Sequence, residues 1–311
     1  MDNTQGKVVL LTGANGFIGS HLLVELKKLY PQWKIKTISR KPVKGVEAWL
    51  SFEDFKNSAI PAGFFSDVAQ VVHLAAVAHK KTGYELRELE DVNVAYLEKL
   101  LSFLENPPTE KIIFLSSFAV SLLEKNILLD TFAYAEAKKR AEQALHSFGK
   151  KRANSFEIVV LRPPMVYGKG APGNFATLVK FLALPIPLPF KSFRSPRTSI
   201  HVKNLTSAIR CVLESPVQKG ISTFEISDPW RESLYQFLSD LKNVISGKAK
   251  LIAFPPAFLA LLLRVVKKEG LYEKLALETH IDNSLFLSRY SWTPPIRFEE
   301  RFNDLREPRN P

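Results

Sequence analysis

A tyrosine and a lysine one helical turn apart could perform acid–base chemistry. Tyr134 and Lys138 lie in the stretch Tyr-Ala-Glu-Ala-Lys, where helical periodicity places residues i and i+4 on one face. An ammonium group beside a phenol favours the phenolate and lowers the tyrosine pKa from about 10 toward neutral pH. Tyr134 is therefore predicted to act as a general acid or base. Because such a pair also arises by chance in a lysine-rich chain, the prediction depends on the residues around it.

Two serines follow an apolar run that is typical of a buried strand. Residues 112–115 are Ile-Ile-Phe-Leu, and Ser116 and Ser117 come directly after them. In open parallel sheets, ligands bind at the carboxyl ends of strands. Ser117 is therefore predicted to hydrogen-bond the substrate oxygen that Tyr134 protonates. The alternative role of Ser117 is simple capping at the end of the strand.

Three glycines at a spacing of three residues follow the first apolar run. Gly13, Gly16 and Gly19 come after the strand-like segment 7–12 and open a helical stretch. Gly13 would permit a tight turn, Gly16 a close approach of the backbone to a pyrophosphate, and Gly19 close packing of the helix, whose dipole favours negative charge. This context predicts a dinucleotide cofactor.

The end of the second predicted strand bears on which dinucleotide is bound. An acidic residue there would bind the ribose 2′-hydroxyl of NAD and repel the 2′-phosphate of NADP, but the chain has Ser39, Arg40 and Lys41. Ser39 and Arg40 could hold a phosphate through a hydroxyl and a guanidinium fork. NADP(H) is therefore favoured over NAD(H). The alternative is that Arg40 stacks on the adenine or is only solvated.

The positive charge is concentrated in the second half of the chain. The formal net charge of +12 divides into +2 for residues 1–150 and +10 for residues 151–311, and the 56 residues 158–213 contain eight Lys or Arg and no carboxylate. Such a segment would attract an anionic ligand; the alternative is a basic solvated surface. No basic block interleaved with aromatic residues is present, so nucleic acid is not an expected partner.

The elements that must position these residues follow an α/β pattern. Strands are predicted at 7–12, 34–39, 71–74, 111–116 and 156–162, with one more near 46–50, and helices at 17–29, 92–104, 132–148, 204–213, 233–245 and 257–266. The alternation predicts a doubly wound parallel Rossmann sheet. Prolines cluster after residue 162, so we expect residues 1–162 to form mainly the dinucleotide-binding domain. Residues 163–311 are expected to form mainly a smaller C-terminal α/β substrate domain, partly interleaved with the first.

Taken together, these motifs resemble the extended short-chain dehydrogenase/reductase family, in particular its NAD-dependent nucleotide-sugar epimerases and reductases. The resemblance covers nearly the whole chain. The matching segments are 12–19, 73–76, 91–94, 116–117, Tyr134 with Lys138, 161–168, 173–175, 187–190, 197–205 and 292–295.

The resemblance implies a reaction and a set of site residues. The reaction is hydride transfer at C4 of a UDP-hexose, by an epimerase or by an NADPH-dependent 4-keto-sugar reductase without epimerisation, with Ser117, Tyr134 and Lys138 as the catalytic residues. A non-catalytic NADP(H)-binding regulator is a further alternative, against which the intact catalytic set argues. Asn174 and Arg197 would bind the substrate diphosphate, and Ser116 would help Ser117 to hold the sugar oxygen. The implied cofactor-binding residues are Gly13, Asn15, Gly16, Phe17, Ile18, Gly19, Ser39, Arg40, Leu74, Ala75, Ala76, Asn93, Tyr134, Lys138 and Pro163. A homodimer is also implied.

Three departures from the family pattern are present, of which one is the loss of an aromatic residue, because residues 120–122 are Val-Ser-Leu where many members have Val-Tyr-Gly. Sugar 4,6-dehydratases of the family carry an acidic pair after the catalytic hydroxyl, whereas this chain has Phe118 and Ala119, so dehydration is disfavoured. Only 16 residues separate Ser117 from Tyr134, which is fewer than is usual in the family. Substrate contacts from that loop are therefore not expected.

Other features exclude further classes of protein. The chain has a single cysteine, six histidines without metal-ligand spacing and no Gly-x-Ser-x-Gly motif, so a disulfide scaffold, a metal site and a serine hydrolase are not expected. No leader-like pattern is present, and we expect a cytoplasmic protein. The apolar run 254–268 is too short and interrupted to span a bilayer. We expect it to be a core helix of the second domain; the alternative is a helix that rests on anionic lipid.

Overall fold

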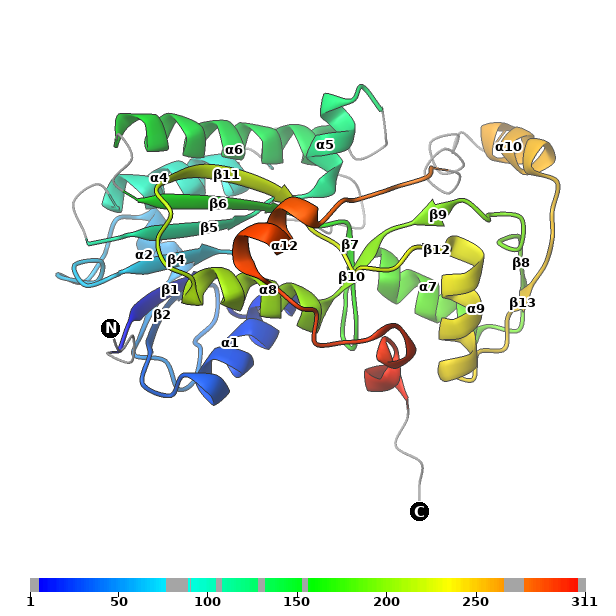
Figure 1. Cartoon of the computed structure of the whole chain (residues 1–311), viewed down its shortest axis with the longest axis horizontal. Helices are drawn as coiled ribbons and strands as arrows, with labels where there is room; N and C mark the ends of the chain where they lie inside the picture. The colour runs from blue at the N-terminus through cyan, green and yellow to red at the C-terminus, as the bar shows by residue number, and fades with distance from the viewer. Residues whose placement is uncertain are drawn as a thin grey trace, which may run out of the picture.

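Seven parallel strands form the central sheet of the computed structural model, which describes residues 6–76, 89, 91–104, 108–127, 132–152, 156–265 and 277–306 (Figure 1). The order across the sheet is β11-β6-β5-β4-β1-β2-β3. Because the chain winds from β1 to β3 on one side and then crosses over to β4, the winding direction reverses between β1 and β4. The strands are β1 (Val8–Thr12), β2 (Lys34–Ser39), β3 (Ala48–Ser51), β4 (Gln70–His73), β5 (Lys111–Leu115), β6 (Glu157–Arg162) and β11 (Gly220–Glu225).

Helices cover both faces of the sheet, which explains why its central strands are buried throughout. Every residue of β1, β4, β5 and β6 is buried, as expected for parallel strands packed on both sides. One face carries α1 (Phe17–Leu29), α8 (Val202–Glu214) and α12 (Ser284–Tyr290). The other face carries α2 (Phe52–Lys56), the π-helical turn η1 (Asp91–Ala95), α4 (Tyr96–Phe103) and α6 (Phe132–Lys151).

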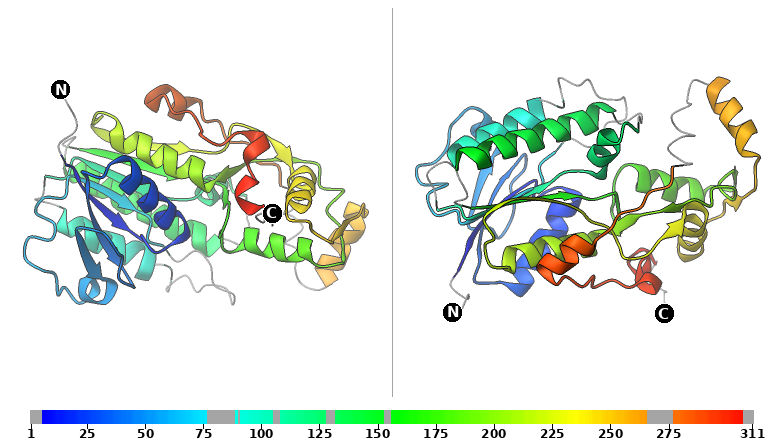
Figure 2. Two further views of the ribbon diagram at one scale, coloured as in Figure 1. Left: turned by 90° about the horizontal axis from the view of Figure 1, so that it is seen from below. Right: turned by 45° about the horizontal axis from the view of Figure 1, so that its top comes forward.

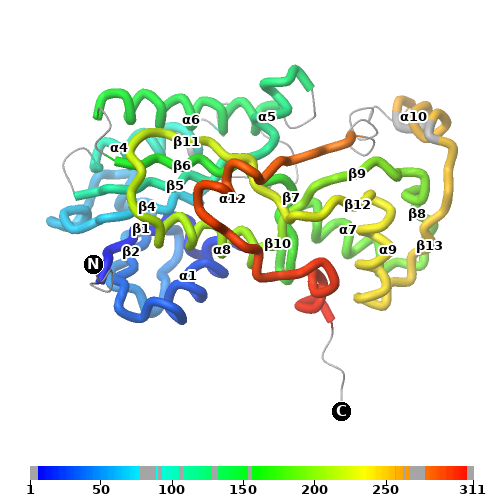
Figure 3. The backbone as a smooth tube through the Cα atoms, viewed as in Figure 1, coloured from blue at the N-terminus to red at the C-terminus, as the bar shows by residue number. Residues whose placement is uncertain are grey.

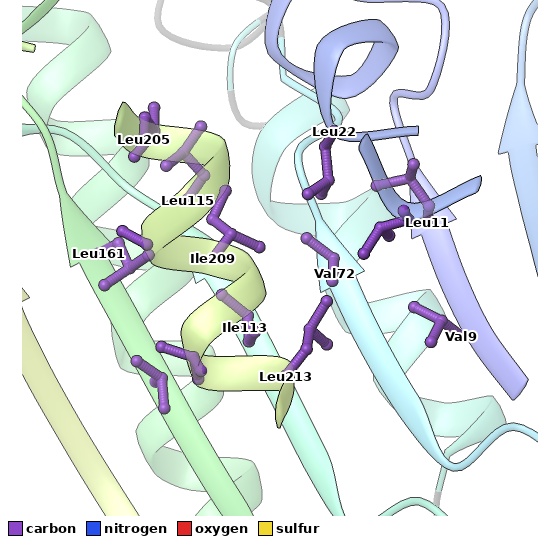
Figure 4. Close-up of a cluster of buried hydrophobic side chains, with 14 of the residues drawn as sticks. Val9, Leu11, Leu22, Val72, Ile113, Leu115, Leu161, Leu205, Ile209 and Leu213 are labelled. Carbon is purple, nitrogen blue, oxygen red and sulfur yellow. The ribbon is translucent and has the colours of Figure 1, made fainter. Parts of the chain in front are cut away.

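Alternate residues of each strand belong to the two apolar cores. Val9 and Leu11 of β1 pack in the core under α1 and α8, whereas Leu10 packs in the core under α4 and α6. Figure 4 shows Leu205 and Ile209 of α8 above side chains of β5 and β6. The doubly wound Rossmann sheet that the sequence predicts is therefore confirmed.

A smaller α/β unit follows the sheet toward the C-terminus (Figure 2). Its strands form three short pairs: β7 (Met165–Tyr167) with β10 (Ser199–His201), β8 (Pro187–Leu188) with β13 (Lys250–Leu251), and β9 (Pro196–Arg197) with β12 (Glu232–Ser233). Its helices are α7 (Asn174–Ala183), α9 (Leu234–Val244), α10 (Pro256–Val265) and the 3₁₀ turns η2 (Phe298–Glu300) and η3 (Asn303–Leu305). A third apolar core joins α7, α9 and the end of the described chain.

Several elements were not predicted from the sequence. The helix α5 (Phe118–Glu124), the helix α7 and the strand β11 lie in segments that showed no clear periodicity. In the backbone trace of Figure 3, β11 lies beside β6 at the edge of the sheet. The segments α8, β11 and α12 all come from beyond residue 162, so the C-terminal half contributes one strand and two helices to the first unit.

The expectation that the apolar helix near residues 257–266 is a core helix is wrong for one of its faces. In α10, Phe258, Leu261 and Val265 are 57%, 56% and 74% exposed, and Leu259 is 7% exposed. The helix lies at the end of the molecule remote from β1–β3 (Figure 1), where Leu259 packs into the C-terminal core. Among the described helices, none is long and apolar enough to cross a bilayer.

Candidate active site

The glycine turn links β1 to the start of α1. Gly13 has φ +72°, and a Cβ atom there would lie 2.8 Å from the backbone nitrogen of Ala75. A Cβ atom on Gly19 would overlap the carbonyl oxygen of Gly13. Side chains at these two positions are therefore excluded by the neighbouring backbone. Gly16 forms the N-cap of α1, and within the described part of the chain no side chain caps this end, so the first-turn amides can bind an anion.

The end of β4 packs against the glycine turn. The Ala75 N–H donates to Thr12 Oγ1 at 3.2 Å, and Thr12 Oγ1 lies 3.0 Å from His73 Nδ1. Burial, together with the charge of Lys138, lowers the pKa of His73 to about 3, so this imidazole is neutral. Residues 74–76 are thereby held beside Gly13, where the sequence predicts the ribose and adenine side of the cofactor.

The predicted acid–base pair lies at the carboxyl end of β5. Lys138 of α6 is 3% exposed, and its Nζ donates to the Leu115 carbonyl oxygen at 2.8 Å. The same ammonium lies 4.7 Å from the centroid of the Phe114 ring. Burial lowers the pKa of Lys138 to about 8, against the opposing charge of Glu142. Tyr134, one turn earlier on α6, is partly buried.

Ser117 forms the N-cap of α5 and remains partly exposed. Its Oγ accepts a hydrogen bond from the Ala119 N–H at 3.2 Å, so the capping role considered for this residue is present. An N-cap hydroxyl acts as an acceptor, which leaves its own hydrogen free to donate. Among the described residues no acceptor for that hydrogen is recorded. The cap therefore holds the Ser117 side chain in place and leaves its hydroxyl able to donate a hydrogen bond at the end of β5.

Ser116 is directed away from Ser117 into a buried ionic network. It is 4% exposed, and its hydroxyl donates to Glu142. Arg162, the last residue of β6, donates to Glu142 through Nε at 3.0 Å and through Nη2 at 2.5 Å. It also donates to Glu124 of α5 at 2.7 Å and to Ser121 at 3.1 Å. This geometry assigns Ser116 to the support of the site, because its hydroxyl is engaged inside the protein.

This network was not predicted from the sequence. The hydrogen bonds from Arg162 hold the pKa of Glu124 below its ordinary value, and the two carboxylates raise the pKa of Arg162. Glu142 follows Lys138 by four residues, so it lies on the same face of α6. The four-residue spacing between Lys138 and Glu142 is the sequence feature from which part of this network could have been predicted. The network joins α6 to the carboxyl ends of β5 and β6, and so fixes the helix that carries Tyr134.

The loop after β2 is tied to the glycine turn. The Ser39 hydroxyl donates to the Lys41 carbonyl oxygen at 2.7 Å and accepts from Asn15 Nδ2 at 3.3 Å and from Trp49 Nε1 at 3.0 Å. Asn15 Nδ2 also donates to the Lys41 carbonyl oxygen at 2.6 Å. Ser39 is 7% exposed whereas Arg40 is exposed. Asn15 and Ser39 therefore shape the loop, and Arg40 is the group that faces solvent.

The remaining predicted cofactor residues lie around the same strand ends. Asn93 is buried in η1. The Pro163 carbonyl oxygen, just after β6, accepts from the Phe118 N–H at 2.9 Å. Ile18 packs against the core beneath α1 and α8, whereas Phe17 packs against the core of the C-terminal unit. Phe17 thus connects the glycine turn to that unit.

The predicted substrate residues Asn174 and Arg197 lie in the C-terminal unit. Asn174 is the first residue of α7 and is exposed, after Gly173 with φ +68°. Arg197 lies in β9, and burial lowers its pKa from the ordinary arginine value. Both belong to the acid-free segment 158–213. No group of three or more His, Cys, Asp or Glu that could hold a metal ion occurs among the described residues.

A Rossmann sheet with a glycine turn and a Tyr-Lys pair at its strand ends defines a dinucleotide-dependent enzyme of the short-chain dehydrogenase/reductase type. Residues 9–226 match the profile of the NAD dependent epimerase/dehydratase family. The chain belongs to this family, and the family expected from the sequence motifs is confirmed.

The similarity to individual relatives extends along most of the chain. A UDP-glucose 4-epimerase of Vibrio cholerae is 27% identical over 97% of this chain and 95% of its own length. The N-acetyl-alpha-D-glucosaminyl-diphospho-ditrans,octacis-undecaprenol 4-epimerase of Escherichia coli O157:H7 is 24% identical over 79% of this chain and 75% of its own. The structure of a UDP-glucuronic acid 4-epimerase from Bacillus cereus, in complex with UDP-glucuronic acid and NAD, superposes with a TM-score of 0.72 at 20% identity, covering 96% of this chain and 97% of that chain.

Proposed function

We propose that this protein oxidises and reduces C4 of a UDP-linked hexose, with Tyr134 as the general acid or base. The observation that carries the proposal is the position of Lys138. Its ammonium donates a hydrogen bond to the carbonyl oxygen of Leu115 at the end of β5. Lys138 lies one helical turn after Tyr134, and Leu115 lies two residues before Ser117, so this bond brings the segments of all three predicted catalytic residues together. The Vibrio cholerae relative, named for activity on UDP-glucose, supports the substrate class.

The residues around β1 and β4 fit a nicotinamide dinucleotide. The Gly13 turn and the uncapped start of α1 would hold its pyrophosphate, and residues 74–76 would line its adenine side. Lys138 would hydrogen-bond the nicotinamide ribose. When bound, the dinucleotide supplies the group that accepts and returns hydride. Arg40 and Lys41, at the end of β2 where no carboxylate stands, favour NADP(H) through attraction to a 2′-phosphate.

The side chains would divide the proton chemistry between them. The charge of Lys138 favours the phenolate form of Tyr134, which takes the proton of the C4 hydroxyl during oxidation and returns it during reduction. The Ser117 hydroxyl donates a hydrogen bond to the same sugar oxygen and holds it in place. Arg197 and Asn174 bind the diphosphate within the basic segment, whose field attracts the anionic substrate.

Two reactions use these residues in the same way and differ in the use of cofactor. An epimerase returns the hydride and consumes no cofactor, whereas a 4-keto-sugar reductase consumes one NADPH for each sugar. The purified protein is incubated with candidate UDP-hexoses, and separately with UDP-4-keto-hexoses, together with a small amount of either dinucleotide in its oxidised or reduced form. Reduced-nicotinamide absorbance and sugar products are followed. Sugar conversion far beyond the amount of cofactor identifies the epimerase, and stoichiometric loss of NADPH identifies the reductase.

Tyr134→Phe tests the acid–base assignment directly. Because it removes only the phenolic oxygen, we expect kcat on the active sugar to fall by at least about a hundredfold. Dinucleotide binding, measured by titration calorimetry, serves as the control and is expected to weaken by a few-fold at most, because the other predicted cofactor contacts remain. If kcat survives within a few-fold, Tyr134 is not the acid or base.

A sugar carried on a lipid diphosphate is a second candidate substrate. It is favoured by the exposed apolar face of α10 and by the Escherichia coli relative, whose name specifies an undecaprenol-linked sugar. Supplying the same hexose on UDP and on a short polyprenyl diphosphate distinguishes the two candidates by their kcat/KM values.

A further inference from the structure

The helix α10 presents an apolar stripe to solvent. Phe258, Leu261 and Val265 are spaced by three and four residues, which places them on one face of the helix, and each is more than half exposed. The opposite side is attached to the protein through Leu259, which is buried in the C-terminal core. At the base of the helix, Phe254 packs against Phe258 with ring centroids 5.4 Å apart. The stripe is therefore held in a fixed orientation.

Two segments that contain no carboxylate are paired next to the start of α10. Residues 158–213 and 241–268 contain no Asp or Glu, and the pairing of β8 with β13 joins them. The Ile252 N–H donates to the Leu188 carbonyl oxygen at 2.9 Å, and the Lys191 N–H donates to the Ile252 carbonyl oxygen at 3.1 Å. Several exposed cations lie on these segments, close to the helix in sequence or through the pairing of β8 with β13: Lys191, Arg194, Lys248, Lys250 and Arg264.

An apolar stripe beside several cations matches the chemistry of one occupant. Apolar side chains bury themselves at the boundary between headgroups and acyl chains, while Lys and Arg are attracted to anionic headgroups. A second copy of this chain would bring two cationic faces together, which like-charge repulsion opposes. The ten residues of α10 are too few to cross a bilayer. Its place at the tip of the C-terminal unit leaves it accessible to a flat surface (Figure 2).

We infer that α10 and its surrounding cations form a docking site for the surface of an anionic lipid bilayer. Phe258, Leu261 and Val265 enter the boundary region, and Arg264 and Lys250 contact the headgroups. Docking through the tip of the C-terminal unit holds the protein at the membrane without a spanning segment. The site is separate from the proposed active site and does not depend on the proposed reaction.

Vesicle flotation tests the inference with the whole protein. The purified chain is mixed with vesicles of phosphatidylcholine alone or with about 30% phosphatidylglycerol and centrifuged through a density gradient. We expect the protein to float with the anionic vesicles, to float poorly with the neutral ones, and to be released as salt rises from about 0.1 M to about 1 M. Failure to float with anionic vesicles at the lower salt concentration overturns the inference.

Pairs of matched variants test which part of the protein contacts the lipid surface. Leu261→Ser on α10 is expected to lower the lipid-bound fraction about tenfold at limiting lipid, whereas Leu285→Ser, at a position on α12 that is 71% exposed, leaves it unchanged. Arg264→Glu is expected to lower binding strongly, and Lys28→Glu on α1, with the same change in net charge, only slightly. Equal losses in each pair would show that binding is not through α10, and the inference would be wrong.

Two further measurements complete the test. Light scattering compares the mass of the unchanged protein with that of Leu261→Ser; a dimer that Leu261→Ser converts to a monomer would assign the stripe to a second copy and overturn the inference. Tyr134→Phe is expected to float like the unchanged protein, because the docking site and the active site are independent. Loss of flotation in that variant would contradict this independence.

Discussion

Glu142→Gln is expected to destabilise the protein and to shift its pH dependence. The side chains of Glu142 and Arg162 are 6% and 11% exposed, and removal of one member of such a buried ion pair costs about 3–5 kcal/mol. Because Arg162 keeps Glu124 as a partner whose side chain is 43% exposed, we expect the lower end of this range, about 3 kcal/mol. That loss corresponds to a fall in Tm of about 5 °C.

The same substitution should change the protonation of Lys138. The charge of Glu142 opposes the lowering of the Lys138 pKa by burial, so its removal should move that pKa below about 8. If the ammonium assists Tyr134, the loss of activity at high pH should begin at a lower pH in the variant. The assays are calorimetric unfolding and a pH profile of kcat on the active sugar.

Glu136→Gln is the matched control for Glu142→Gln. Glu136 lies on the same helix and pairs with Arg140 four residues later, but the two side chains are 25% and 45% exposed. An exposed i,i+4 pair contributes about 0.3–0.5 kcal/mol, so its loss should change Tm by about 1 °C. Equal changes in Tm for the two variants would refute the argument that the buried network holds α6 in place.

Three other variants test the cofactor site and the charge beside Tyr134. Gly13→Ala forces a Cβ toward the Ala75 backbone at φ +72°, so we expect dinucleotide affinity to fall at least about tenfold by calorimetry; unchanged affinity would contradict the role of the turn. Arg40→Ala is expected to raise KM for NADPH about tenfold and to leave KM for NADH unchanged, and an unchanged NADPH value would remove the phosphate role. Since burial lowers the pKa of Lys138 to about 8, activity should fall as pH rises through that value; Lys138→Arg, which stays charged, should retain a flatter profile at high pH by the same kinetic assay.

The glycine turn and the Tyr-Lys pair could be predicted because their signals are local. Gly13 and Gly19 are fixed by close approach of neighbouring backbone, and the four-residue spacing of Tyr134 and Lys138 is a property of one helix. The bounds predicted for the helix 17–29 and the strand 34–39 are those observed for α1 and β2. In each case a short stretch of sequence determines its own geometry.

Features that depend on packing between distant segments were harder to predict from the sequence. Glu142 is a charged residue in a helix, which sequence alone assigns to solvent, and only its contact with Arg162 of β6 explains its burial. The strand β11 lies at the edge of the sheet with most residues partly exposed, so it lacks the continuous apolar run of a central strand. The exposed face of α10 belonged to the alternative interpretation of this run, and a core helix was favoured because the composition of the run is that of a buried helix.

The strand β11 comes about sixty residues after its neighbour β6 in the sequence, and this separation affects how the sheet forms during synthesis and in truncated forms of the chain. Glu157 of β6 is fully buried, bonded to Lys111 and to the Tyr290 hydroxyl, and the Gly220 N–H donates to the Phe156 carbonyl oxygen. A fragment that stopped at residue 162 would leave this carboxylate without its Tyr290 partner and one strand edge unpaired, and exposed edges recruit other chains. The nascent sheet therefore stays incomplete until β11, which ends at Glu225, has been made, and Glu157 gains its hydrogen bond from Tyr290 later still. The two halves are therefore stabilised together.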